Sequence, residues 1–413
     1  MKKMTLSEEL TWRGFVKQTT YKNITELDGE PIIFYWGVDP SADSMTVGNF
    51  AAAMMVRHFI DHGHKAVLLV GGATGLIGDP DGKKQERDLK DEDEIAKNIK
   101  GILSQYETAF AGQKFEVVNN YDWFKDINYL NFLRTIGKHL SMTQLLDREF
   151  VQSRIGEGGA GISYAEFSYS IIQGYDFLHL YREKGVTLQV CGADQWGNSL
   201  AGVEMIRKLE AGESHVYSTP LVVNKTTGVK FGKSEEGAVW LDGAKTSPYK
   251  FYQFWLNADD EGVADYLKIY TLIQPEEFEV LMKQFKESPQ DRAAQKYLAF
   301  EVTKLVHGEK RAESVKNVSD VLFGRKEFSV LTKYDIEELA KEITVTSGNN
   351  LVEVLVDSSL AASNTEANRF LQAGSVSVNG TKVLQNTELS SIEAVDSHYL
   401  IKHGKNNFTL VKS

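Results

Sequence analysis

Residues 31–49 read PIIFYWGVDPSADSMTVGN, and this stretch decides the fold of the first half of the chain. Apolar residues 31–38 predict a strand, Pro40 follows in a turn, and a helix then begins whose first turn carries Gly48. The first turn of a helix has free backbone N–H groups and the positive end of the helix dipole. The sequence therefore predicts a strand–turn–helix unit that can bind an anion at the helix N-terminus.

The same alternation of β-rich runs and helical stretches continues to about residue 220. Four runs are predicted to be strands: 32–38, 66–70, 115–119 and 186–191. Five longer stretches are predicted to be helices: 50–61, 91–109, 129–139, 164–181 and 196–208. Together with the glycine-rich strand exits, this alternation predicts an α/β fold, a Rossmann-like doubly wound parallel sheet. Ligands of such sheets lie beyond the carboxyl ends of the strands.

A different pattern begins after residue 247. Five helices are predicted, at 249–256, 264–272, 275–286, 293–306 and 311–322, and they are followed by a polar stretch and by two short helices with an Asn379-Gly380 hairpin. We therefore divide the chain into a catalytic domain (1–247), a helical domain (248–324), a linker (325–349) and a small α+β module (350–413).

The composition is that of an ordinary soluble globular protein. The 413 residues are 42% hydrophobic and 25% charged, which is enough for two or three domains. An apolar run of 18 residues and an apolar signal core are both missing from the sequence, and Cys191 is the only cysteine. These features predict a cytoplasmic location without membrane insertion. The net charge of −11 argues against indiscriminate nucleic-acid binding but permits a local basic track.

A second short segment, KFGKS at residues 230–234, lies far downstream of the first. Lys230 and Lys233 bracket a Phe-Gly hinge, so a mobile loop carries two point charges. Such a loop suits a polyphosphate whose charge moves during a reaction. Short Lys/Gly strings also occur by chance, so this segment alone is a weak signal.

Together and in this order, the two segments resemble the HIGH and KMSKS signatures of class I aminoacyl-tRNA synthetases. Further motifs narrow the resemblance to bacterial tyrosyl-tRNA synthetase: VGGATGLIGDP (70–80), NNYDW (119–123), DQWGN (194–198) and TSPYKFYQFW (246–255). The likeness extends from about Trp12 to the C-terminus. It implies that residues 248–324 lie on the anticodon side and that residues 350–413 form an α-L-type RNA-binding module.

Tyr169, Gln173 and Asp176 recur at i, i+4 and i+7 in an otherwise apolar helix, which places them on one face. From spacing alone, a solvated helix side is the more frequent explanation, whereas the neighbouring apolar residues favour a pocket. The resemblance implies the pocket. It assigns tyrosine binding to Tyr35, Asp79, Asn120, Tyr169, Gln173, Asp176 and Gln195. Tyr35 and Asp176 would hydrogen-bond the phenolic hydroxyl, so phenylalanine would leave both unpaired.

The resemblance also implies the chemistry, which is attack of the tyrosine carboxylate on the α-phosphorus of ATP and transfer of tyrosyl to tRNA(Tyr). Such a reaction needs positioning and charge stabilisation rather than a protein nucleophile. ATP enters as a substrate with Mg²⁺, without a tightly bound cofactor or a protein metal site. The catalytic candidates are Lys230, Lys233, Ser41, Thr46, Lys83 and Arg87. The ATP-binding candidates are Gly37, Asp39, Gly48, Asn49, Gly192, Asp194, Phe231 and Gly232. Arg207 and Lys208 are candidates for phosphates of the tRNA acceptor stem.

The sequence departs from the family pattern in three places. Thr46 stands where the HIGH element normally has histidine, and it is shorter than an imidazole. Trp36, beside the tyrosine pocket, is much bulkier than the small residue usual there. Residues 349–413 carry five basic and six acidic side chains, few positive charges for an RNA-binding module.

These departures keep alternatives open beside the leading hypothesis, which is a homodimeric tyrosyl-tRNA synthetase. Thr46 and the acidic C-terminal module fit a catalytically weakened RNA-binding or regulatory paralogue. A tryptophan-specific relative is the third possibility, and the pair of Tyr35 and Asp176 argues against it because an indole has no hydroxyl. Dimerisation is implied by the family resemblance and has no pattern of its own in the sequence.

Overall fold

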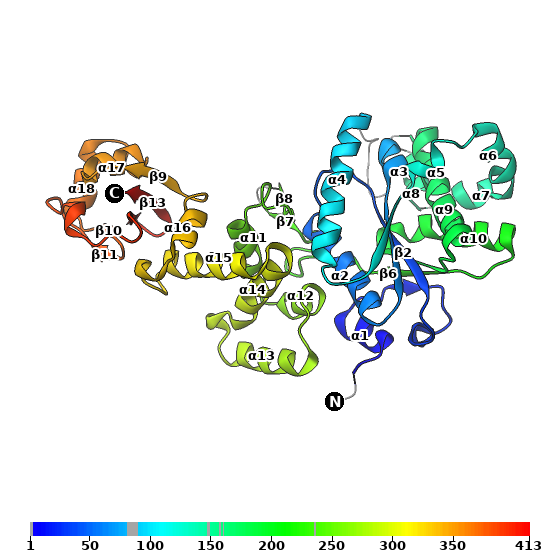
Figure 1. The fold of residues 1–413 in the computed structure, drawn as a ribbon, viewed down its shortest axis with the longest axis horizontal. Helices are drawn as coiled ribbons and strands as arrows, with labels where there is room; N and C mark the ends of the chain where they lie inside the picture. Colours follow the sequence, from blue (N-terminus) through cyan, green and yellow to red (C-terminus); the bar gives the residue numbers. More distant parts are fainter. Residues whose placement is uncertain (1–2, 81–89, 147–148, 157, 160, 235–236) are drawn as a thin grey trace. The chain divides into compact units, whose positions relative to one another are not determined.

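A computed structural model describes residues 3–80, 90–146, 149–156, 158–159, 161–234 and 237–413 (Figure 1). The chain divides into two compact units. Unit 1 comprises Met1–Thr246 and Asn257–Leu298, and unit 2 comprises Ser247–Leu256 and Ala299–Ser413. Among the described residues, no helix is both long and apolar enough to cross a membrane.

Unit 1 is built on a six-stranded sheet with the order β1-β6-β5-β2-β3-β4. Its strands are β1 (Gln18–Thr19), β2 (Ile33–Val38), β3 (Lys65–Val70), β4 (Phe115–Asn119), β5 (Leu188–Gly192) and β6 (His215–Thr219). All neighbouring pairs are parallel except β1 with β6. The predicted fold class and the four predicted strands are confirmed, whereas β1 and β6 were not predicted.

Helices cover both faces of this sheet, as a doubly wound fold requires. Successive side chains of β2 point to opposite faces: the ring of Tyr35 packs 5.3 Å from Phe177 of α9, and that of Trp36 packs 5.6 Å from Tyr106 of α4. The helices of this part are α1 (Leu6–Arg13), α2 (Val47–Asp61), α3 (Gly72–Ile77), α4 (Glu92–Ala109), α5 (Tyr121–Phe124), α6 (Tyr129–Thr135), α7 (Met142–Leu146), α8 (Glu149–Ile155), α9 (Tyr164–Lys184) and α10 (Trp196–Glu210). They are followed by α12 (Val263–Tyr270) and α13 (Pro275–Glu287).

The ends of these helices have local causes. At the start of α9, the Ser163 side chain accepts from the N–H of Glu166, and at its end Gly185 adopts a left-handed conformation at φ 67°. Asp91 caps α4 in the same way as Ser163 caps α9. The helix predicted at 129–139 is shorter than expected, because α6 ends at Thr135 and a 3₁₀ turn follows at Gly137–His139.

Unit 2 contains helices and a second, smaller sheet. The helices are α11 (Pro248–Leu256), the part of α14 (Ala293–His307) from residue 299, α15 (Glu309–Leu322), α16 (Lys333–Leu339), α17 (Leu351–Asp357) and α18 (Asn364–Gln372). The strands are β9 (Thr344–Ser347), β10 (Val376–Val378), β11 (Thr381–Lys382), β12 (His398–His403) and β13 (Asn407–Lys412), in the order β11-β10-β12-β13-β9. The predicted hairpin is confirmed: Asn379 and Gly380 join β10 to β11 at φ 50° and 88°.

The stretch 325–349 is not the free connection that its polar sequence suggested. It contains α16 and β9, and β9 pairs in parallel with β13 near the C-terminus. Ile336 and Leu339 of α16 pack in one core with residues of α15 and with Leu400 and Leu410 of the small sheet. The interpretation of these residues as a linker is therefore wrong for the part from α16 to β9, while the other domain boundaries stay a prediction.

Candidate active site

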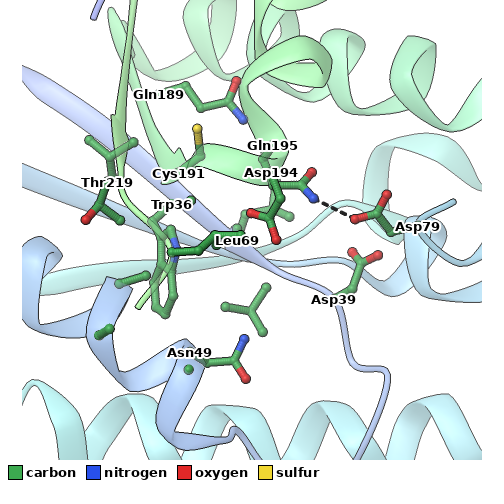
Figure 2. A pocket seen from close by; sticks show the side chains of 18 of the residues that line it. Trp36, Asp39, Asn49, Leu69, Asp79, Gln189, Cys191, Asp194, Gln195 and Thr219 are labelled. Atoms are coloured by element: carbon green, nitrogen blue, oxygen red, sulfur yellow. Dashed lines mark hydrogen bonds between the residues drawn. The ribbon is translucent and has the colours of Figure 1, made fainter. Parts of the chain in front are cut away.

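A cavity of about 280 Å³ opens at the carboxyl ends of β2 and β5 and at the N-terminus of α2 (Figure 2). The strand–turn–helix unit of residues 31–49 supplies much of its wall. The cavity is lined by these residues predicted to act in the site: Tyr35, Gly37, Asp39, Ser41, Thr46, Gly48, Asn49, Asp79, Tyr169, Gln173, Asp176, Gly192, Asp194, Gln195, Lys230 and Phe231. The stripe on α9 therefore faces a cavity rather than solvent.

The other predicted site residues lie elsewhere. Asn120 is fully buried behind the wall, and Gly232 follows the cavity-lining Phe231 without lining the cavity itself. Lys83 and Arg87 fall outside the described residues, as does the side chain of Lys233. Arg207 and Lys208 are on α10, and both form ion pairs with Glu204 of the same helix. The positive charge of that pair is therefore partly neutralised within the helix.

One end of the cavity carries the phenol and carboxyl groups expected to recognise a hydroxyl. Tyr35 is buried on β2, and its hydroxyl has no hydrogen-bond partner among the described residues. Asp176 accepts from Asn120 Nδ2 at 3.1 Å and from Trp123 Nε1 at 2.9 Å. Burial, with a smaller contribution from the negative charge of Asp39, raises the pKa of Asp176 to about 8. Both groups are therefore buried, and one still lacks a partner.

Two further carboxylates lie in the same cavity and are held by neutral donors. Tyr169 donates its hydroxyl to Asp39 Oδ2 at 2.7 Å, and Thr74 donates to Asp39 Oδ1 at 2.6 Å. Gln195 Nε2 donates to Asp79 Oδ2 at 2.6 Å (Figure 2). Burial raises the pKa of Tyr169, so the phenol stays protonated and able to donate. Carboxylates fixed in this way form a negative region suited to an ammonium group.

Unpaired amide oxygens add to this region. Gln173 and Gln189 both line the cavity. The Oε1 atom of each is buried and has no hydrogen-bond partner in the described part of the chain. A buried polar atom without a partner costs free energy unless a ligand or water satisfies it. Together with the Tyr35 hydroxyl, they mark this end of the cavity as built to be occupied.

The opposite end is formed by the N-terminus of α2. Both the backbone N–H and the hydroxyl of Thr46 donate to Asn49 Oδ1, at 3.0 and 2.9 Å. Because the amide oxygen of Asn49 is held in this way, its amide nitrogen points into the cavity (Figure 2). Thr46 thus acts on the cavity through Asn49, and the positive end of the α2 helix dipole adds to a site for an anion.

The KFGKS segment closes this end. Phe231 is buried and its ring stacks 4.2 Å from Tyr266 of α12, which anchors the loop. Lys230 Nζ lies 3.6 Å from Asp194 Oδ2, and its side chain is 56% exposed. An exposed pair of this kind contributes little to stability. The lysine is therefore free to exchange Asp194 for a phosphate at little cost.

Sequence reasoning missed several residues that line the cavity or lie directly behind its wall. Trp123 orients Asp176, Thr74 orients Asp39, and Gln189 supplies an unpaired acceptor. Trp123 and Thr74 lie within quoted motifs, so their presence was visible but their contacts were not. Gly71 beside Thr74 is required by close approach, since a Cβ there would lie 2.1 Å from Asp39 Oδ1. Trp36 lines the cavity from the face of β2 opposite to Tyr35.

Comparisons with known proteins agree with this geometry. Residues 27–324 match the family of class I tRNA synthetases of the W and Y type, and residues 335–411 match the C-terminal domain of tyrosine–tRNA ligases. Tyrosine–tRNA ligase of Geobacillus kaustophilus is 42% identical over 99% of this chain and 100% of its own length. The chain belongs to the tyrosine–tRNA ligase family.

A second relative and a solved structure extend the likeness. Tyrosine–tRNA ligase of Bacteroides fragilis is 40% identical over 99% of each chain. The crystal structure of a C-terminally truncated mitochondrial tyrosyl-tRNA synthetase from Aspergillus nidulans has a TM-score of 0.70 at 27% identity. The matched region covers 78% of this chain and 95% of the Aspergillus nidulans chain. The predicted membership of the tyrosyl-tRNA synthetase family is confirmed.

Proposed function

We propose that the chain is a tyrosine–tRNA ligase, which activates L-tyrosine with ATP and transfers tyrosyl to tRNA(Tyr). The observation that carries the proposal is the buried Tyr35 hydroxyl without a partner, beside Asp176, at one end of a cavity whose other end is a helix N-terminus. The relatives named tyrosine–tRNA ligase over the full chain support the same activity. The alternative of a regulatory paralogue is not favoured.

In the first step, the tyrosine end of the cavity would hold the amino acid. Tyr35 and Asp176 would pair with the phenolic hydroxyl, and Asp79 with Tyr169 and Gln173 would surround the ammonium group. Asn120 and Trp123 would act one layer behind, because they hold Asp176. Phenylalanine would leave Tyr35 and Asp176 without the partner that a hydroxyl supplies. The same requirement disfavours an indole, and with it a tryptophan-specific enzyme.

The remainder of the cavity would hold ATP, taken as its Mg²⁺ complex. Asp194 and the Gly192 backbone would face the ribose, and Asn49 with the N-terminus of α2 would face the phosphates. Lys230 and Lys233, with Ser41, Lys83 and Arg87, are proposed to neutralise the departing pyrophosphate. Mg²⁺ would be bound mainly by phosphate oxygens, as is usual for this ion with nucleotides.

In the second step, tRNA(Tyr) would accept the tyrosyl group. The C-terminal module is the proposed tRNA-binding part, supported by its match to the C-terminal domain of tyrosine–tRNA ligases. Arg207 and Lys208 are proposed to contact acceptor-stem phosphates, for which each would have to leave Glu204. Because ATP and tRNA are the substrates, we propose the cytoplasm as the place of action.

We also propose that the chain works as a homodimer. Apolar side chains that are between 37% and 73% exposed gather on α6 to α9. They are Tyr129, Leu130, Leu133, Met142, Leu146, Ile155 and Tyr164. The hydroxyl oxygens of Tyr129 and Tyr164 lie 3.2 Å apart and form a hydrogen bond. This bond connects α6 to the start of α9. Exposed apolar surface of this kind is typical of a protein–protein interface.

Tyrosine-dependent exchange of pyrophosphate into ATP, followed by charging of tRNA(Tyr), tests the function. We expect exchange with tyrosine, and much less with phenylalanine or tryptophan. Exchange without charging would favour the paralogue, and exchange driven by tryptophan would overturn the substrate assignment.

A further inference from the structure

A second cavity lies in unit 1, away from the residues assigned above. It measures about 540 Å³ and is lined by side chains of α1, of the C-terminal half of α2 and of the segment that leads into α13. Its lining residues are Lys3, Met4, Glu9, Arg13, His58, Asp61, His62, Leu272, Gln274, Pro275 and Glu276. The cavity is large enough for a small organic molecule.

Four of the polar side chains that line this cavity form a network around Glu9, namely Glu9, Arg13, His58 and His62. Glu9 accepts from Arg13 Nε at 2.8 Å, from His62 Nε2 at 2.7 Å and from His58 Nδ1 at 3.2 Å. Three donors keep the pKa of Glu9 below its usual range, despite the opposing effect of burial. Glu9 is therefore a carboxylate, and a carboxylate can only accept hydrogen bonds.

This network fixes the state of His58. Because Nδ1–H donates a hydrogen bond to the Glu9 carboxylate, Nε2 of the neutral ring carries a lone pair. Burial lowers the pKa of His58, which favours that neutral ring. The side chain is only 2% exposed, and Nε2 has no hydrogen-bond partner among the described residues. His58, a lining residue of the cavity, therefore has a buried acceptor that requires a donor.

The charges around this acceptor favour a cation. Glu9 is balanced by Arg13, whose guanidinium also donates to the carbonyls of Lys268, Thr271 and Ile273. Of the remaining charged residues of the lining, Asp61 and Glu276 are negative and Lys3 is positive. His58 and His62 also lie at the C-terminal end of α2, where the helix dipole is negative.

We propose that this cavity binds a small organic cation through ammonium N–H groups, one of which donates to His58 Nε2. An ammonium group supplies both the missing donor and the positive charge, whereas a quaternary ammonium supplies only the charge. A ligand of this class, such as an alkylamine or a polyamine, would contact α1, α2 and the start of α13 together. The site is independent of the proposed catalytic residues.

Isothermal titration calorimetry of the full chain with spermidine, putrescine and tetramethylammonium tests the proposal. We expect each of the two amines to bind at one site. Tetramethylammonium, which has the charge but neither an N–H nor an O–H donor, should bind at least about tenfold more weakly, because a buried hydrogen bond to a charged group contributes roughly 1.5–3 kcal/mol. Equal binding of tetramethylammonium, or no binding of either amine at millimolar concentration, would overturn the assignment.

Substitutions locate the binding. His58→Leu removes the acceptor and is expected to abolish amine binding, but it could also disturb the Glu9 network. Glu276→Gln is therefore the second variant, because Glu276 is exposed on the rim and is expected to weaken binding about threefold, as a surface charge does. Glu277→Gln, the exposed neighbour that does not line the cavity, is the matched control. Amine binding that both cavity variants leave unchanged would place the ligand elsewhere and refute the site.

Discussion

The two ends of the catalytic cavity are built differently. At the proposed tyrosine end, two carboxyl groups are each held by two donors: Asp176 accepts from Asn120 and Trp123, and Asp39 accepts from Tyr169 and Thr74. At the proposed phosphate end, Lys230 is 56% exposed, and its ion pair within the described residues is with Asp194. Under the proposed function, a preorganised pocket selects the amino acid, and a more exposed loop stabilises the developing charge.

The largest expected effect is at the phosphate end of the cavity. Lys230→Ala should slow tyrosyl-adenylate formation by ~10²–10³-fold, as loss of one donor to a developing charge does. Tyrosine binding should stay the same, because that end of the cavity does not include the lysine. Single-turnover activation and equilibrium binding of tyrosine measure the two effects separately.

A nearby lysine provides the control for this variant. Lys225 precedes the KFGKS segment, pairs with Asp265 and does not line the cavity. Lys225→Ala should therefore leave activation unchanged. If Lys230→Ala weakens tyrosine binding as much as it slows the reaction, the loop has a structural role and the comparison between the two ends fails.

The second-largest effect on activity is expected at the tyrosine end of the cavity. Asp176→Asn should lower kcat/KM for tyrosine by roughly 10- to 100-fold. The new NH2 group would replace an oxygen that accepts from Asn120 or from Trp123, and a buried donor left without an acceptor costs about 1–3 kcal/mol. Steady-state exchange kinetics measure it. An Asp176→Asn enzyme with normal kcat/KM for tyrosine would show that Asp176 does not contact the substrate.

The same substitution has a pH signature in the protein without substrate. Folding raises the pKa of Asp176 from 3.8 to about 8. Between pH 3.8 and pH 8, Asp176 is therefore protonated in the folded state and ionised in the unfolded state. Stability should then fall as the pH rises through this window, with loss complete above pH 8. The Tm of the wild type should fall more steeply than that of Asp176→Asn between pH 6 and 9. Parallel Tm curves would contradict the raised pKa.

A smaller effect is expected for Tyr35→Phe. It removes one neutral hydrogen bond, so kcat/KM for tyrosine should fall about 2- to 10-fold while phenylalanine is rejected less well. Tyr106→Phe is the control, since Tyr106 is equally buried but donates to the carbonyl of Leu69 and does not line the cavity. Exchange rates with both amino acids decide; equal selectivity in the two variants would exclude Tyr35 from recognition.

The smallest effect is expected where Thr46 acts through Asn49. Thr46→Val removes the hydroxyl that holds Asn49 Oδ1, and activation should slow by about 2- to 5-fold, within the range for one neutral hydrogen bond. Thr46→Ser keeps the hydroxyl and should keep the rate. Thr46→His also removes it, so we expect slower activation there as well. A histidine variant that is faster than the wild type would instead mean that the imidazole reaches the phosphates directly.

The sequence predicted the elements whose signals are long and repetitive. The strands β2 to β5 and the amphipathic helices follow from runs of apolar residues at regular spacing. β1 was missed because it has only two residues and depends on its antiparallel partner, and β6 because it is short and half polar. The β9 strand was missed for a similar reason: exposed residues Thr344–Ser347 become a strand only through β13 at the other end of the module.

The site divides in the same way. The spacing of Tyr169, Gln173 and Asp176 predicted one helix face, and the structure places that face in the cavity. The contacts of Trp123 with Asp176 and of Thr46 with Asn49 could not be predicted, because each depends on side-chain orientation. The network of Glu9, His58 and His62 could not be predicted, since Glu9 lies 53 residues before His62 and their contact depends on how α1 and α2 pack.

The position of β13 has a consequence for the order in which the protein is made. The last strand of the chain lies between β12 and β9 inside its sheet, so neither neighbour can complete its pairing before translation reaches Lys412. The catalytic sheet, by contrast, has all six strands by Thr219 and can form while the rest is still being synthesised. A ribosome that stops before Asn407 would therefore release a chain with the complete six-stranded sheet of unit 1 and with unpaired edges on β12 and β9 in the second sheet.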